Sequence, residues 1–131
     1  MSNPTVWPCI NYRDARGAIA FLTSAFGFVE SLVVPGEHDD DIAHAQLTWP
    51  EGGGVMLGSA DRDESEFSRM PTSCASVYVV TADPHSVYAK AQAAGAAVVR
   101  EMRDEDYGST GFSVRDPEDN IWSFGTYRGE D

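Results

Sequence analysis

The chain has 131 residues, the length of a single domain, and its 9 basic and 21 acidic residues give a net charge of −12. This charge argues against nucleic acid as a partner, because phosphates are bound by Lys and Arg. The sequence contains neither an apolar run long enough to cross a membrane nor a charged-then-apolar leader, so we expect a cytoplasmic protein. The two cysteines, Cys9 and Cys74, are too few for a disulfide scaffold.

The first half of the chain predicts one helix and four strands. Asp14 can cap a helix over residues 15–26, and Gly27 can end it. Stretches rich in β-branched and aromatic residues predict strands at residues 6–12, 28–34, 42–49 and 55–59. The polar stretch at residues 60–72 has no clear period and is interpreted as a linker.

The second half predicts the same order of elements. Asp83 can cap a helix with Pro84 in its first turn, a favoured place for proline, and Gly95 can close it. Strands are predicted at residues 74–81, 97–100, 109–115 and 121–127, with an acidic loop at residues 101–106. The last two strands form a hairpin, because the turn formers of residues 116–120 lie between them.

Several landmarks of the two halves recur at nearly one offset. Residues 54–59 resemble residues 121–126, which lie 67 positions later, and the capping residues Asp14 and Asp83 are 69 positions apart. An internal duplication explains this spacing better than chance does. We therefore predict an α+β fold in one domain, with β-α-β-β-β modules at about residues 5–60 and 73–127 and a linker at residues 61–72.

The two modules are predicted to pair, since a four-stranded sheet with one helix leaves its other face uncovered. Side by side they would form a curved eight-stranded sheet, with the helices outside and a concave face inside. A concave face is where small ligands bind.

The order and spacing of these pieces resemble the vicinal oxygen chelate superfamily, which includes glyoxalase I, extradiol dioxygenases and bleomycin-resistance proteins. The matching pieces are residues 11–14 leading into a helix that ends at 25–28, residues 83–96, and the turn and strand at 116–122. One departure is Asp119, where the family usually has glycine. The resemblance implies the family fold, and it implies a homodimer whose clefts are completed by the partner chain.

Metal-binding members of the family take His, Glu or Gln ligands from the first and last strands of each half. The corresponding positions here are Trp7, Met56, Ser76 and Ser123, none of which is a customary ligand of a hard divalent metal. The resemblance therefore carries no metal, cofactor or catalytic residue over to this chain. Two histidines, His38 and His44, flank three aspartates, which is interpreted as a solvated acidic loop in preference to a metal site.

The residues expected to line the concave face follow from the alternation of side chains along each strand. They are Trp7, Cys9, Asn11, Met56, Ser76, Tyr78, Ile121 and Ser123. This lining is aromatic, soft and sparsely polar, so it suits a flat organic ligand that stacks on Trp7. Acidic loops at residues 37–41, 61–66 and 101–106 would favour a cationic ligand if they rim the cleft.

Together these features predict a metal-independent binding protein of the glyoxalase and bleomycin-resistance superfamily, which sequesters an aromatic or cationic drug or metabolite. Antibiotic resistance is one role that the resemblance implies. The alternative from another class is a glyoxalase-like lyase or isomerase enzyme. A third hypothesis is an orphan domain whose cleft is filled by its own side chains and serves only assembly.

Overall fold

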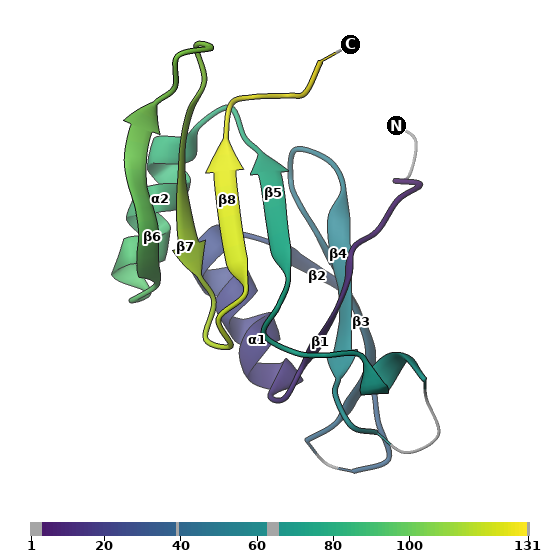
Figure 1. Cartoon of the computed structure of the whole chain (residues 1–131). Coiled ribbons are helices and arrows are strands. Elements are labelled where there is room, and N and C mark those ends of the chain that lie inside the picture. Colours follow the sequence, from purple (N-terminus) through teal and green to yellow (C-terminus); the bar gives the residue numbers. More distant parts are fainter. Residues whose placement is uncertain (1–3, 39, 63–65, 131) are drawn as a thin grey trace.

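Eight strands in two four-stranded sheets and two helices make up the protein in a computed structural model that describes residues 4–38, 40–62 and 66–130 (Figure 1). The first half forms β1 (Cys9–Tyr12), α1 (Ala15–Phe21), β2 (Val29–Pro35), β3 (Ile42–Thr48) and β4 (Gly54–Ser59). The second half forms β5 (Ser76–Val80), α2 (Pro84–Ala93), β6 (Ala97–Asp104), β7 (Thr110–Arg115) and β8 (Ile121–Gly125). The α+β class and the order β-α-β-β-β in each half are confirmed.

The two sheets have the same topology. The strand order is β1-β4-β3-β2 in the first sheet and β5-β8-β7-β6 in the second. In each sheet the first strand of the module pairs in parallel with the last strand, and the other neighbours are antiparallel. Equivalent topologies of this kind are what an internal duplication predicts.

Both helices begin at the aspartates that the sequence indicated. The Asp14 carboxylate accepts a hydrogen bond from the backbone N–H of Gly17 at 3.0 Å, and the Asp83 carboxylate accepts one from Ser86 at 3.1 Å. Gly27 and Gly95 follow the helices with φ angles of 93° and 81°, in the left-handed region that favours glycine. After α1 the chain widens into a π-helical turn, Leu22–Phe26.

Two strand boundaries differ by more than two residues from those expected. The first strand begins at Cys9 and not at residue 6, because Pro8 has no N–H to donate to a ladder, and Val6 is largely exposed. The sixth strand continues to Asp104, where we expected an acidic loop from residue 101. Its charged side chains are tolerated because β6 is an edge strand and most of its residues are exposed.

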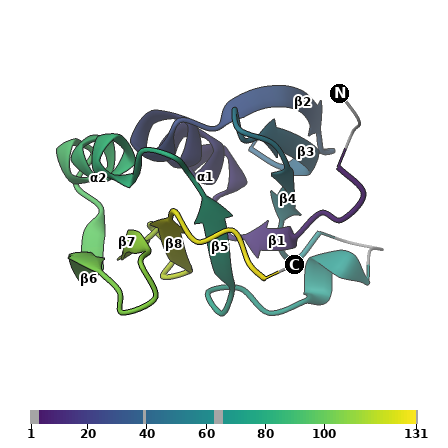
Figure 2. The ribbon, with the colours of Figure 1, turned by 90° about the horizontal axis from the view of Figure 1, so that it is seen from above.

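The hydrophobic core lies between the modules, and both halves contribute to it. Figure 2 shows α1 and α2 next to each other, and α2 contacts the π-helical turn that follows α1. The ring of Phe26, in that turn, lies 5.6 Å from Trp122 and 4.7 Å from Phe124 of β8. No helix in the described part of the chain is long and apolar enough to cross a membrane.

The last turn of each module holds the start of the other module's helix. The Glu118 carboxylate accepts from the backbone N–H groups of Arg13 and Asp14, at 2.7 and 2.8 Å. The Glu51 carboxylate accepts from the backbone N–H of Ala82 at 2.8 Å. Glu51 and Glu118 occupy equivalent positions of the repeat, so these reciprocal carboxylate contacts relate the two halves by an approximate two-fold arrangement.

Candidate functional site

Each sheet has one face against the core and one open face. In β1 the side chains of Ile10 and Tyr12 are buried, whereas Cys9 and Asn11 alternate to the other side. The strand registers then place a row of side chains across each open face. The first row is Cys9, Met56, Gln46 and Leu32, and the equivalent second row is Tyr78, Ser123, Ser113 and Arg100.

A pocket of about 300 Å³ lies on the open face of the first sheet. It contains three of the residues predicted from the sequence, Cys9, Asn11 and Met56. The amide nitrogen of Asn11 donates to the backbone carbonyls of Phe67 and Met70, so it holds the 3-10 helix Phe67–Arg69 beside this face. The ring of Phe67 also lines the pocket and is 81% exposed, so an aromatic surface is available there.

A smaller pocket of about 170 Å³ lies on the open face of the second sheet and contains Tyr78 and Ser123. Hydroxyls dominate it: those of Ser113 and Ser123 are 2.7 Å apart, and the Tyr78 hydroxyl donates to the carbonyl of Tyr127 at 2.7 Å. Burial raises the pKa of Tyr78, which keeps its hydroxyl protonated as a donor.

The other three predicted residues line neither of these two pockets. Trp7 precedes β1, and its ring lies so close to Gly54 that a Cβ there would come within 2.7 Å of Trp7 Cζ3. Ser76 and Ile121 pair at the start of β5 and β8. The eight residues therefore do not line one pocket within a single chain: three line the pocket on one open face, two line the pocket on the other, and three line neither of these pockets.

Each open-face pocket also has an arginine in its lining, which the sequence argument did not place there. Arg62 lies in the first pocket and Arg100 in the second. The sequence argument followed only the first and last strands of each module, whereas Arg62 comes from the linker and Arg100 from β6. The register of β6 with β7, which brings Arg100 beside Ser113, has no signal in the sequence.

The positions at which the family carries its metal ligands do not fit a hard divalent metal here. They offer an indole, a thioether and two hydroxyls, from Trp7, Met56, Ser76 and Ser123. In the ranges that the structure describes, no three His, Cys, Asp or Glu side chains form a group that could hold a metal ion. His38 is exposed, His44 lies in β3, and Asp39 between them is outside the described residues.

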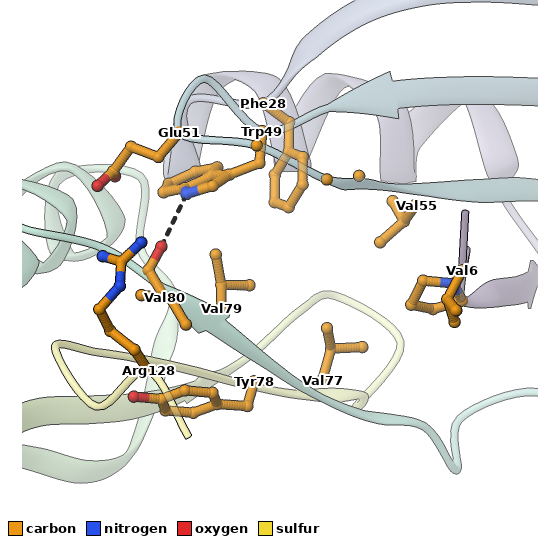
Figure 3. A pocket seen from close by; sticks show the side chains of 14 residues that line it. Val6, Phe28, Trp49, Glu51, Val55, Val77, Tyr78, Val79, Val80 and Arg128 are labelled. Carbon is orange, nitrogen blue, oxygen red and sulfur yellow. Dashed lines mark hydrogen bonds between the residues drawn. The ribbon is translucent and has the colours of Figure 1, made fainter. Parts of the chain in front are cut away.

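A third pocket, of about 380 Å³, lies at the junction of the two modules (Figure 3). Its walls come from the segment that joins β3 to β4, from β4 itself and from β5, and Arg128 of the C-terminal segment lies at one end. Sequence reasoning missed this pocket, because it depends on how the modules pack and not on a motif within either of them.

Comparison with known proteins agrees with this architecture. The sequence profile of the Glyoxalase/Bleomycin resistance protein/Dioxygenase superfamily matches residues 5–124. An uncharacterized protein of Mycobacterium bovis and one of Mycobacterium tuberculosis are each 32% identical over 130 residues, which cover 93% of this chain and 82% and 74% of those proteins, respectively.

Solved structures show the same arrangement. TioX from Micromonospora sp. ML1 is 28% identical, with a TM-score of 0.79 over 95% of this chain and 98% of that chain. A glyoxalase/bleomycin resistance protein from Streptomyces sp. CB03234 is 22% identical, with a TM-score of 0.68 over 94% of this chain and 98% of that chain, a likeness that shows the fold alone. Since the family profile spans nearly the whole chain, the chain belongs to the Glyoxalase/Bleomycin resistance protein/Dioxygenase superfamily.

Proposed function

We propose that the protein binds and sequesters an aromatic drug or metabolite without using a metal. The observation that carries this proposal is the pocket on the open face of the first sheet, whose lining is soft and aromatic. Met56 and Phe67 supply a polarizable thioether and an exposed ring, and Cys9 lies beside Met56 in the register. The family to which the chain belongs includes bleomycin-resistance proteins by its description, which supports a role in resistance.

The charge of the proposed ligand depends on the net charge of the protein and on the arginines in the pockets, which favour ligand groups of opposite sign. The net charge of −12 favours cations over long distances. The arginines of the two open-face pockets, Arg62 and Arg100, favour an acceptor group at short range, and Arg100 shares its pocket with Glu105, whose carboxylate lies 3.9 Å from it. A planar aromatic cation that also carries carbonyl or hydroxyl acceptors satisfies both, and this is the ligand class that we propose.

The binding unit that we propose is a homodimer. The predicted site residues lie on two different faces of one chain, with Cys9 and Met56 on the first sheet and Tyr78 and Ser123 on the second. A second copy that set its second sheet opposite the first sheet of its partner would bring both groups into one cleft. Exposed apolar side chains on the first face, Leu32 and Val34 of β2, support a contact there.

The proposal is tested by a binding screen of planar aromatic compounds in cationic, neutral and anionic sets, measured by fluorescence and calorimetry. We expect Phe67→Ala to weaken a true ligand about tenfold, the effect of losing roughly 1.4 kcal/mol of contact. Because Phe67 is largely exposed, this change should leave the melting temperature unaltered. The matched control is His85→Ala, which removes an exposed ring of α2 that lines neither open-face pocket.

Trp7→Ala tests the stacking role predicted for Trp7. If Trp7 stacks on the ligand, the change weakens binding about tenfold. If its ring mainly packs on β4 at Gly54, the change lowers stability and leaves affinity intact. The proposed function would be contradicted if no planar compound in the screen bound the wild type with a dissociation constant below about 1 mM.

A further inference from the structure

We propose that the pocket at the module junction is a second binding site, separate from the pocket on the open face of the first sheet, for a small apolar molecule that carries one carboxylate. The pocket lies between the segment joining β3 to β4 in the first module and β5 in the second (Figure 3). Its apolar lining includes the core-side residues Val55, Val77 and Val79, whereas Met56 and Cys9 lie on the other face of the first sheet. Tyr78 lines both this pocket and the pocket on the second open face.

The walls of the junction pocket are apolar. Phe28 and Trp49, whose ring centroids are 5.0 Å apart, form part of one wall with Val55, and Val77 and Val79 of β5 form the wall opposite (Figure 3). The apolar side chains that border this open pocket of about 380 Å³ offer surface that an apolar ligand can cover. This volume is within the range of about 300–1,000 Å³ for small-molecule pockets.

The end of the pocket where Glu51 and Val80 lie also carries the guanidinium group of Arg128. Arg128 reaches across this end from the C-terminal segment (Figure 3). Within the described ranges, no carboxylate lies within ion-pairing distance of the Arg128 guanidinium. Glu51, the acidic residue of this end, already accepts the backbone N–H of Ala82. A planar guanidinium with free donors matches the two oxygens of a carboxylate.

The edge of β5 adds a second donor. The Trp49 indole N–H donates to the Val80 carbonyl at 3.0 Å, so this edge of β5 faces the pocket. The Ala75 carbonyl and the Thr81 N–H bond to β8 on the other edge. Backbone groups of alternate residues point to the same edge, so the Tyr78 N–H faces the pocket as the Val80 carbonyl does. It can donate to a ligand oxygen.

The overall negative charge does not exclude an anion at this site. At physiological salt, charges more than about 8 Å away are largely screened, so the nearest groups decide what binds. The charged residues that line the junction pocket are Arg128 and Glu51, and Glu51 is engaged as described.

The test uses 2-naphthoate as the probe and the full chain labelled with ¹⁵N. We expect the Trp49 indole N–H signal and the Tyr78 and Val80 amide signals to shift saturably, while the Phe67 and Ser68 amide signals, from residues that line the open-face pocket of the first sheet and not the junction pocket, stay in place. This pattern separates the junction site from the open-face site, so either proposal can fail without the other.

Variants identify the groups that bind. Arg128→Gln should weaken 2-naphthoate about tenfold and leave the uncharged 2-naphthamide unaffected. Val77→Phe, which fills the space, should weaken both compounds. Arg69→Gln is the matched control, since Arg69 is exposed and does not line the junction pocket.

Three outcomes would overturn the proposal. The first is that millimolar 2-naphthoate leaves the Trp49 indole signal unmoved. The second is that Arg128→Gln and Arg69→Gln weaken binding equally. The third is that 2-naphthylmethylamine, the cationic counterpart, binds at the Trp49 signal more tightly than 2-naphthoate does.

Discussion

The hydroxyl of Tyr12 donates a hydrogen bond to the carboxylate of Asp116 at 2.6 Å, across 104 residues of chain. Both side chains are buried, and Tyr12 is completely so. The Trp122 indole N–H and the Asn120 backbone N–H also donate to Asp116, at 3.0 and 3.1 Å. A buried carboxylate is stabilised only when donors surround it, so this contact couples the end of β1 to the last turn of the second module.

Tyr12→Phe removes the hydroxyl and keeps the ring. We expect it to lower the free energy of unfolding by roughly 1.5–3 kcal/mol, the effect of a hydrogen bond to a charged group. Urea unfolding measures this value. Tyr88→Phe is the control, because the Tyr88 ring packs on Phe112 and its hydroxyl makes no hydrogen bond within the described ranges; an equal loss in both variants would contradict the prediction.

The same pair predicts how stability depends on alkaline pH. Burial and the Asp116 carboxylate raise the pKa of Tyr12 well above its usual range. Below about pH 10 this tyrosine is protonated in both states, so its contribution to stability is fully present. Above that pH the unfolded chain loses the proton and the folded chain keeps it, so stability falls by up to about 1.4 kcal/mol per pH unit. Urea unfolding across this range should give a flatter profile for Tyr12→Phe; parallel profiles would refute the assignment.

The reciprocal carboxylate contacts predict unequal effects of two equivalent changes. Glu118→Ala removes an acceptor for two backbone donors and should cost about 1 kcal/mol, whereas Glu51→Ala removes an acceptor for one and should cost less. Thermal and urea unfolding compare them. Glu101→Ala, an exposed residue of β6, should change stability by less than about 0.5 kcal/mol. A larger loss of stability in Glu51→Ala than in Glu118→Ala would show that these contacts do not set the stability of the helix starts.

The side chains at the four positions where the family carries its metal ligands predict that the purified protein contains little metal. Trp7, Met56, Ser76 and Ser123 offer no imidazole or carboxylate, so elemental analysis should find well below one equivalent of Zn, Ni, Fe or Mn. Dialysis against each of these ions, followed by the same measurement, is the control for loss during purification. Stoichiometric metal that a chelator removes together with an activity would favour the enzyme hypothesis.

The proposed homodimer predicts a sedimentation mass about twice that of the chain at micromolar concentration. Leu32→Arg places a charge in the row that contains Met56 and should shift the protein toward monomer, because a buried unpaired charge is costly. Gln92→Arg, on the exposed side of α2, adds the same charge elsewhere and should leave the mass unchanged. A wild-type monomer at these concentrations would count against the dimer and the shared cleft.

The fold was more predictable than the site, for a physical reason. Helix starts at Asp14 and Asp83 and the hairpin turn around Asp119 depend on local chemistry, and the structure has all three, with Asp119 at a φ of 70°. Alternation also placed Cys9 and Met56 on one face. The position of Trp7, the arginines in the two pockets and the junction pocket depend on how distant segments pack, and no local pattern encodes that.

The reciprocal carboxylate contacts of Glu51 and Glu118 have a consequence for which part of the chain can fold by itself. One module alone would expose the backbone donors at the start of its helix and half of the aromatic core around Phe26 and Trp122. The linker keeps the two modules close together and makes few of these contacts itself. A chain cut within residues 61–72 should therefore reassemble from its two fragments, while neither fragment folds by itself.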